Sequence, residues 1–235
     1  MDMSEKLTHA INPSVIFEIH LFGITIPIRD TIVTIWVIMA GIILLSFILT
    51  RKLKTVPEGK QNVAEIFVEF INSFAKNNIG HHWRHFAPYL GTILIFLIFA
   101  NIVSIFNIIP GEHFKLRPPT KNINVTACLA IISIMVVLFS GIRFKKFSGW
   151  LKSFIEPIPI VLPFKILDYF IRPMSLALRL FGNILGAFII MELIYLVVPA
   201  VIPAFLSLYF DLFDGILQAY IFVFLTSLYI TETIE

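Results

Sequence analysis

The chain has 235 residues, of which 58% are hydrophobic and only 14% are charged, and its mean hydropathy is +0.91. Soluble domains are nearer half apolar and about a quarter charged, so this composition excludes a soluble globular protein. The single cysteine, Cys128, excludes an internal disulfide framework, and the 24 phenylalanines argue against disorder. A formal net charge of +3 is a small excess on so apolar a chain. Whether it indicates nucleic-acid binding or membrane topology depends on where the basic residues lie in the sequence.

Three apolar segments have the length and composition of conventional membrane spans. A spanning helix needs about 20 mostly apolar residues. Residues 31–49, 89–109 and 123–142 each provide such a run without a charged side chain. We therefore predict three spanning helices in this part of the chain.

Two further apolar segments, residues 164–198 and 204–230, are longer and contain charged side chains. As one helix, the first would reach about 52 Å, well beyond the roughly 30 Å hydrocarbon layer, so it must tilt or begin outside the bilayer. Pro199 and Pro203 bracket the short connection between the segments. The pattern predicts a long tilted helical hairpin, in which Pro173 is a candidate kink. The predicted fold is therefore an all-α polytopic membrane protein with about five crossings.

The distribution of lysine and arginine predicts the orientation. Twelve of these residues fall between the first and second spans or between the third span and residue 172 in the first part of the hairpin, against five in the first 30 residues and between the second and third spans. Basic residues concentrate in cytoplasmic loops. We expect residues 1–30 outside, the C-terminus in the cytoplasm, and a positive charge that reflects topology rather than nucleic-acid binding. No cleavable signal peptide is recognisable before the first span.

Residues 60–77 form an amphipathic pattern between the first two spans. Apolar side chains recur at helical spacing on one face, and polar side chains occupy the other. The apolar set is Val63, Ile66, Phe67, Phe70, Ile71 and Phe74. We predict a helix on the cytoplasmic membrane surface, anchored in lipid or docked on protein.

Arg179 lies in the middle of the first long segment, where an unpaired charge costs several kcal/mol or more. A snorkelling arginine, or one paired within the chain, is the alternative to a functional one. The spacing places polar and small residues on the same helix face. They are Ser175, Arg179, Gly182, Asn183 and Gly186. The two glycines would allow another helix to come close.

Acidic residues cluster toward the predicted outer end of the hairpin. Asp211, Asp214 and Gln218 are spaced to share one α-helical face, and Glu192 lies near the outer end of the partner helix. This pattern is typical of a hydrated entry lined by titratable groups. Asp211 and Asp214 could instead be simple interfacial residues. Toward the cytoplasm, Asp168 is either part of an exit path or one partner of an interfacial salt bridge.

The run GHHWRHF contains His81, His82 and His85, whose spacing could serve a metal ion. No HExxH motif or second histidine set accompanies it, so an interfacial loop is the favoured interpretation. The phosphate-binding pattern GxxxxGK[ST] is also absent from the sequence. We therefore expect no metal, no cofactor and no nucleotide bound by this chain.

The runs SLALRLFGNILG and LQAYIFVFLTSLYI closely resemble subunit a of the rotary F-type ATP synthase. The similarity extends over most of the chain, including HLFGITIPI before the first span. It implies an essential arginine, a following asparagine and a glutamine, which are here Arg179, Asn183 and Gln218. Phe188 and Lys165 stand where family members commonly have titratable residues.

The resemblance implies a stationary, non-catalytic ion-channel subunit of an ATP synthase. Its expected partners are the c-subunit ring, the b subunits of the peripheral stalk and the bilayer, and its expected location is a bacterial plasma membrane. Ions, either H⁺ or Na⁺, would pass through two half-channels to and from a ring carboxylate, with Arg179 between them. We expect Glu192, Asp211 and Asp214 in the outer path and Asp168 in the inner one.

Two other classes of protein remain as alternatives. A secondary transporter would usually have two matched halves, which five unequal crossings do not provide. A membrane-bound metalloenzyme would need more ligands than His81, His82 and His85.

Overall fold

The computed structural model describes residues 15–21, 24–51, 53–103, 118–155, 159–197, 206 and 208–234. In this part of the chain, five helical stretches are long and apolar enough to cross a membrane. This confirms the prediction of an all-α polytopic membrane protein. The long helices are α2 (Asp30–Thr50), α3 (Lys60–Ile79), α4 (Trp83–Ile102), α5 (Ile123–Ile155), α6 (Leu162–Val197) and α8 (Gly215–Ile234).

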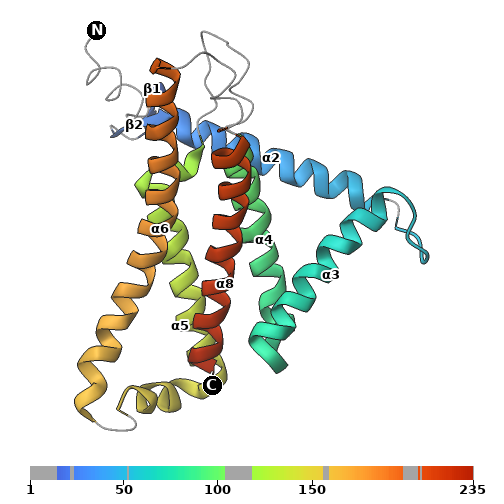
Figure 1. The fold of residues 1–235 in the computed structure, drawn as a ribbon. Helices are drawn as coiled ribbons and strands as arrows, with labels where there is room; N and C mark the ends of the chain where they lie inside the picture. Colours follow the sequence, from blue (N-terminus) through green and yellow to red (C-terminus); the bar gives the residue numbers. More distant parts are fainter. Residues whose placement is uncertain are drawn as a thin grey trace.

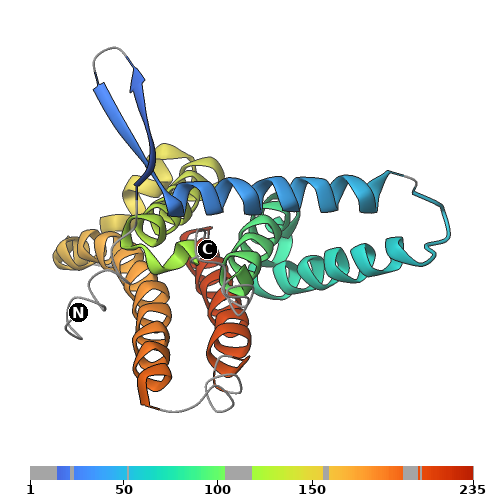
Figure 2. The ribbon, with the colours of Figure 1, turned by 90° about the horizontal axis from the view of Figure 1, so that it is seen from above.

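Helices α4, α5, α6 and α8 run side by side, while α2 extends away from them and α3 leads back to α4 (Figures 1 and 2). The core lies where α4, α5 and α8 meet and includes Leu90, Leu97, Val137 and Ile230, each almost fully buried. Only 11% of the most apolar stretch of α2 is buried inside the protein. Because its apolar side chains face outward, α2 is suited to lipid rather than to the core.

Polar residues begin two of these helices. The Asp30 carboxylate accepts a hydrogen bond from the Thr31 backbone N–H at 2.7 Å, at the start of α2. Asn122 lies just before α5, and its side-chain oxygen accepts a hydrogen bond from the Asn124 N–H at 3.0 Å. Each bond satisfies a backbone donor that has no partner within the first helical turn.

The amphipathic helix α3 divides its apolar residues between two environments. Ile71, Phe74 and Ile79 are buried in the core, and Thr231 of α8 donates a hydrogen bond to the Asn78 carbonyl at 2.7 Å. Val63 remains 66% exposed near the other end. The second half of α3 is therefore a protein-docking helix, and the first half keeps an apolar surface for lipid.

The structure differs from the sequence-based expectations in several elements. No secondary structure is predicted from the sequence for residues 1–30, whereas residues 15–29 contain an antiparallel hairpin, β1 (Val15–Leu21) and β2 (Ile24–Arg29). Helix α4 begins at Trp83, six residues before the expected span, and the end of that span lies outside the described residues. A positive φ of 60° at Lys146 interrupts α5, whereas α6 continues through Pro173. Gly80–His82 is a single 3-10 turn, η1, and His85 is helical, so GHHWRHF is not a loop.

Candidate functional site

The centre of α6 presents one face to the core and the opposite face outward. Leu176, Ala177 and Leu180 are buried on the inner side. Arg179 and Asn183 are exposed on the outer side. The 3.6-residue period of the helix produces this division, because residues four positions apart share a face, as Leu176 and Leu180 do on the inner side.

The outer face of α6 is open at its two glycines. A Cβ atom built on Gly182 or on Gly186 would meet nothing within 4 Å among the residues that the structure describes. Ser175, predicted for the same face, is partly buried. This stretch of α6 therefore has room for a neighbouring helix that does not belong to the chain.

Arg179 has no ion pair or hydrogen bond within the parts of the chain that the structure describes. It lies in a helical stretch whose mean hydropathy reaches 1.8. A guanidinium in such a segment requires water or a carboxylate as a partner. The described residues do not supply that partner.

Asn183 and Gln218 join the two long helices at the site. The Asn183 side-chain N–H donates to the Gln218 side-chain oxygen at 2.8 Å, and Gln218 is only 2% exposed. The sequence predicted that the arginine face and the glutamine face could meet in an antiparallel hairpin, and this bond shows that they do. Because Gln218 is buried and Asn183 is exposed, this hydrogen bond lies at the edge of the outward face that carries Arg179.

We expect this bond to contribute modestly to stability. Polar pairs between membrane helices average about 0.6 kcal/mol in double-mutant cycles, with a maximum of about 1.7. Asn183→Leu, Gln218→Leu and the double variant should therefore give a coupling free energy of about 0.5–1.5 kcal/mol when unfolding is followed in mixed micelles. A coupling of zero would mean that the two amides do not interact.

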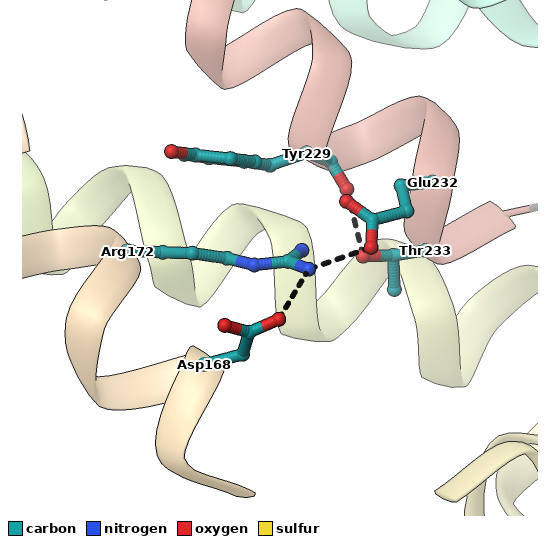
Figure 3. A network of polar contacts seen from close by, with 5 residues as sticks. All are labelled: Asp168, Arg172, Tyr229, Glu232 and Thr233. Atoms are coloured by element: carbon teal, nitrogen blue, oxygen red, sulfur yellow. Dashed lines mark hydrogen bonds and ion pairs between the residues drawn. The ribbon is translucent and has the colours of Figure 1, made fainter. Parts of the chain in front are cut away.

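Toward the other end of the hairpin, Arg172 lies between two carboxylates (Figure 3). Its Nη2 atom is 2.6 Å from Glu232 of α8 and 3.4 Å from Asp168 of α6. The guanidinium carbon also lies 5.0 Å from the Tyr229 ring centroid. Arg172 thus fastens the start of α6 to the end of α8, and its shorter bond is to Glu232.

Sequence reasoning missed Glu232, although a signal was available. In an antiparallel hairpin, a residue after Gln218 on α8 faces a residue before Asn183 on α6, so Arg172 and Glu232 fall at corresponding depths. Asp168 is 55% exposed and takes part in the salt bridge that was its alternative interpretation.

At the opposite end, the structure describes only some of the predicted acidic residues. The side chains of Glu192 and Asp211 lie outside the described parts, although their backbones belong to α6 and to η5 (Leu208–Asp214). Asp214, the last residue of η5, is partly buried. Because η5 is a π-helix, the α-helical spacing used to place Asp211, Asp214 and Gln218 on one face does not hold through this turn.

Two further polar features near this end were not singled out from the sequence. Lys121 of η3 (Pro119–Lys121) is 8% exposed, and its ammonium lies 2.8 Å from the ring centroid of Phe188 on α6. Buried Asn101 of α4 accepts a hydrogen bond from Thr120 and donates one to the Gly215 carbonyl, both at 2.8 Å. A cation and a buried amide therefore lie at the same end of α6 as the predicted outer path.

Two of the three histidines of GHHWRHF pack against an aromatic ring. The rings of His82 and His85 lie 4.3 and 5.8 Å from the Phe144 ring, measured between centroids. Among the described residues, no group of three or more His, Cys, Asp or Glu side chains is arranged to hold a metal ion. The geometry therefore gives no support to the metalloenzyme alternative.

Comparison with known proteins decides the family. The family model described as the ATP synthase A chain matches residues 32–231. The chain belongs to the ATP synthase subunit a family. It is therefore an ion-channel subunit of the Fo membrane sector, part of an ATP synthase complex, and a multi-pass membrane protein.

Individual relatives agree over most of the chain. It is 39% identical over 212 residues to ATP synthase subunit a of Gloeobacter violaceus, a match covering 88% of this chain and 84% of the relative. It is 34% identical over 229 residues to ATP synthase subunit a of Moorella thermoacetica, covering 97% and 99%. It is also 33% identical over 217 residues to a sodium ion specific ATP synthase subunit a of Propionigenium modestum, covering 88% and 75%. The family membership leaves the transporter alternative without support.

Proposed function

We propose that the chain forms two offset half-channels that carry H⁺ or Na⁺ to and from a carboxylate on a rotating c ring, with Arg179 between them. The observation that carries this proposal is the exposed Arg179, unpaired among the described residues, on a helix face left open at Gly182 and Gly186. An open face with a fixed cation suits a passing helix that bears a carboxylate.

The physical role of Arg179 in this proposal is electrostatic. A cation beside the ring favours the ionised form of the ring carboxylate, so the bound ion is released toward the exit. The same charge repels cations and blocks a continuous path between the half-channels. Arginine suits the role because it keeps its charge, whereas a desolvated lysine can lose its proton. The chain supplies no catalytic group in this scheme and works with the ring and with the b subunits of the peripheral stalk.

We assign Glu192, Asp211 and Asp214 to the outer half-channel and Asp168 to the inner one. Support for the outer assignment is the position of these residues at the end of the hairpin where α6 stops and η5 begins. For Asp168, the support is its exposure and its longer contact with Arg172. Glu232 binds the same guanidinium more closely, so Asp168 is the more readily exchanged partner.

We further propose that the membrane is a bacterial plasma membrane and that the C-terminal end of α8 faces the cytoplasm. Contacts of α8 with Arg172 and with Asn78 group its end with the basic stretch around residues 143–172 and with the end of α3. Such a concentration of basic residues favours the cytoplasmic side.

Cysteines introduced near Lys54 and Lys146 should react with a membrane-impermeant reagent only from the cytoplasmic side. One introduced near Val201 should react only from outside. Labelling in oriented vesicles measures this directly. Reaction of the Lys54 and Val201 positions from the same side would contradict five crossings with this orientation.

The proposed ion path is tested by removing its outer acids. Replacing Glu192 by Leu or Asp211 by Leu should slow ion-driven ATP synthesis several-fold or more, because a titratable or hydrating group contributes roughly 100-fold or more to proton transfer where it participates. Assembly should be unchanged, and Asp214→Leu should have a smaller effect if it lies at the rim. Normal synthesis rates in both the Glu192 and Asp211 variants would place the outer path elsewhere.

A further inference from the structure

A basic hollow lies where α3 turns into α4, and its lining residues are not among those assigned to the proposed ion path. It has a volume of about 410 Å³ and is lined by Lys76, Gly80, His81, Trp83 and Arg84. Gly80 has a φ of +70°, in the left-handed region that favours glycine, and its N–H closes α3 on the Lys76 carbonyl. This turn brings a cation from the end of α3 and another from the start of α4 to one cavity.

The hollow carries hydrogen-bond donors without an acidic partner. Within the described residues, Lys76 and Arg84 make no salt bridge, and both are exposed. The Arg84 guanidinium carbon lies 5.5 Å from the Trp83 ring centroid, which restrains it beside the hollow. His81 adds an exposed imidazole. Two unneutralised cations facing one cavity favour an anionic ligand with several acceptor oxygens.

The surroundings indicate that this anion is attached to a lipid. Helix α4 leaves the hollow as an apolar stretch, and Ile66 and Phe70 of α3 expose apolar side chains to the exterior. Trp83 is of the residue type that concentrates at the membrane interface. A basic pocket between helices at this depth matches the chemistry of a phospholipid headgroup, whose acyl chains need an apolar surface beside it.

We propose that this hollow binds the phosphate of an anionic phospholipid, of the phosphatidylglycerol or cardiolipin class. Lys76 and Arg84 contact the phosphate oxygens, Trp83 packs on the glycerol backbone, and the acyl chains lie along α3 and α4. The site does not depend on the proposed ion path. In the proposed orientation it belongs to the cytoplasmic leaflet, because the end of α3 contacts the C-terminal end of α8 through Thr231 and Asn78.

The test compares lipid retention by the ATP synthase complex in nanodiscs of phosphatidylcholine with a minor fraction of phosphatidylglycerol. After extraction with mild detergent, native mass spectrometry counts the phosphatidylglycerol that remains bound. The double variant K76Q/R84Q should retain about 25-fold less, since each basic residue near a membrane surface contributes roughly fivefold. The matched control R51Q/K60Q removes one arginine and one lysine outside the hollow and should retain the wild-type amount. Arg51 is similarly placed over an aromatic ring, that of Phe47.

Three results would overturn the proposal. Equal retention by K76Q/R84Q and by the control would mean that the hollow does not select the headgroup. Displacement of the lipid by inorganic phosphate would mean that the hollow takes the free anion. A cross-link from W83C to another protein subunit that persists after delipidation would mean that protein covers it. Because the readout is bound lipid in an assembled complex, it is independent of whether ions follow the proposed path.

Discussion

Substitution of Arg179 by Ala should abolish coupled ATP synthesis while the complex still assembles. Without the fixed cation, the ring carboxylate keeps its ion as it passes. A neighbouring opposite charge lowers a carboxylate pKa by about 1–3 units, so ion release should slow by roughly 10- to 1,000-fold. Assembly should survive because Arg179 makes no ion pair or hydrogen bond with the described part of the chain. The measurement is ATP synthesis by reconstituted vesicles under an imposed ion gradient.

Arg179→Lys is the matched variant for this prediction. It keeps a charge, but a lysine ammonium is compact, strongly hydrated and able to lose its proton in a dry setting, so rescue should be poor. An assembled Arg179→Ala complex that synthesises ATP at the wild-type rate would contradict the electrostatic role. Full activity of the lysine variant would show that any cation suffices.

Replacement of Gly182 or Gly186 by Leu should block coupling with the ring without unfolding the chain. A Cβ at either position meets nothing within 4 Å in the described part of the chain, so the new side chain projects away from it. If the ring helix packs there, overpacking costs about 1–3 kcal/mol, which corresponds to roughly 5- to 150-fold weaker association. Ring retention during purification and ATP synthesis measure the effect, and the unfolding of the chain should be unchanged.

Two other glycines provide controls for this experiment. A Cβ at Gly41 of α2 also meets nothing within 4 Å, so Gly41→Leu should leave both assembly and activity intact. A Cβ at Gly141 would lie 2.6 Å from a Thr233 methyl and 2.7 Å from the Trp150 ring, so Gly141→Leu should destabilise the chain itself. Normal ring retention and synthesis in both Gly182→Leu and Gly186→Leu would show that the ring does not approach this face.

Long apolar runs made most of the helices readable from the sequence. Helix α2 spans Asp30–Thr50 where residues 31–49 were expected, because an uncharged run of that length has no soluble alternative. Helix α4 begins earlier than its uncharged run predicts, because Arg84 and His85 belong to its first turn. Charged side chains are tolerated in the first turn of a helix at a membrane interface, so charge alone does not end a helix there. The hairpin at residues 15–29 was missed although its runs are rich in β-branched residues on either side of a glycine.

The parts of the site that depend on local spacing could be predicted from the sequence, and the parts that depend on tertiary packing could not. The face that contains Arg179 and Asn183 follows from helical periodicity, and the hairpin predicted that it could meet Gln218. The contact of Lys121 with Phe188 could not be predicted in this way, because it joins segments far apart in the sequence. The contact of Glu232 with Arg172 also joins distant segments, but the pairing of the hairpin helices offered a signal for it. The π-helical turn η5 likewise depends on tertiary context, and it upset the spacing used for Asp211.

The most direct test of whether Arg179 separates two half-channels is a measurement of passive ion flux through the isolated Fo sector while its ring is held still. In vesicles whose ring is cross-linked to another stationary subunit, the wild-type sector should pass no ions under an imposed potential, because transport needs rotation. The Arg179→Ala sector should still conduct, since the barrier between the half-channels is gone. Equal block of the wild-type and Arg179→Ala sectors would contradict the account, as would conduction by the wild-type sector with an immobile ring.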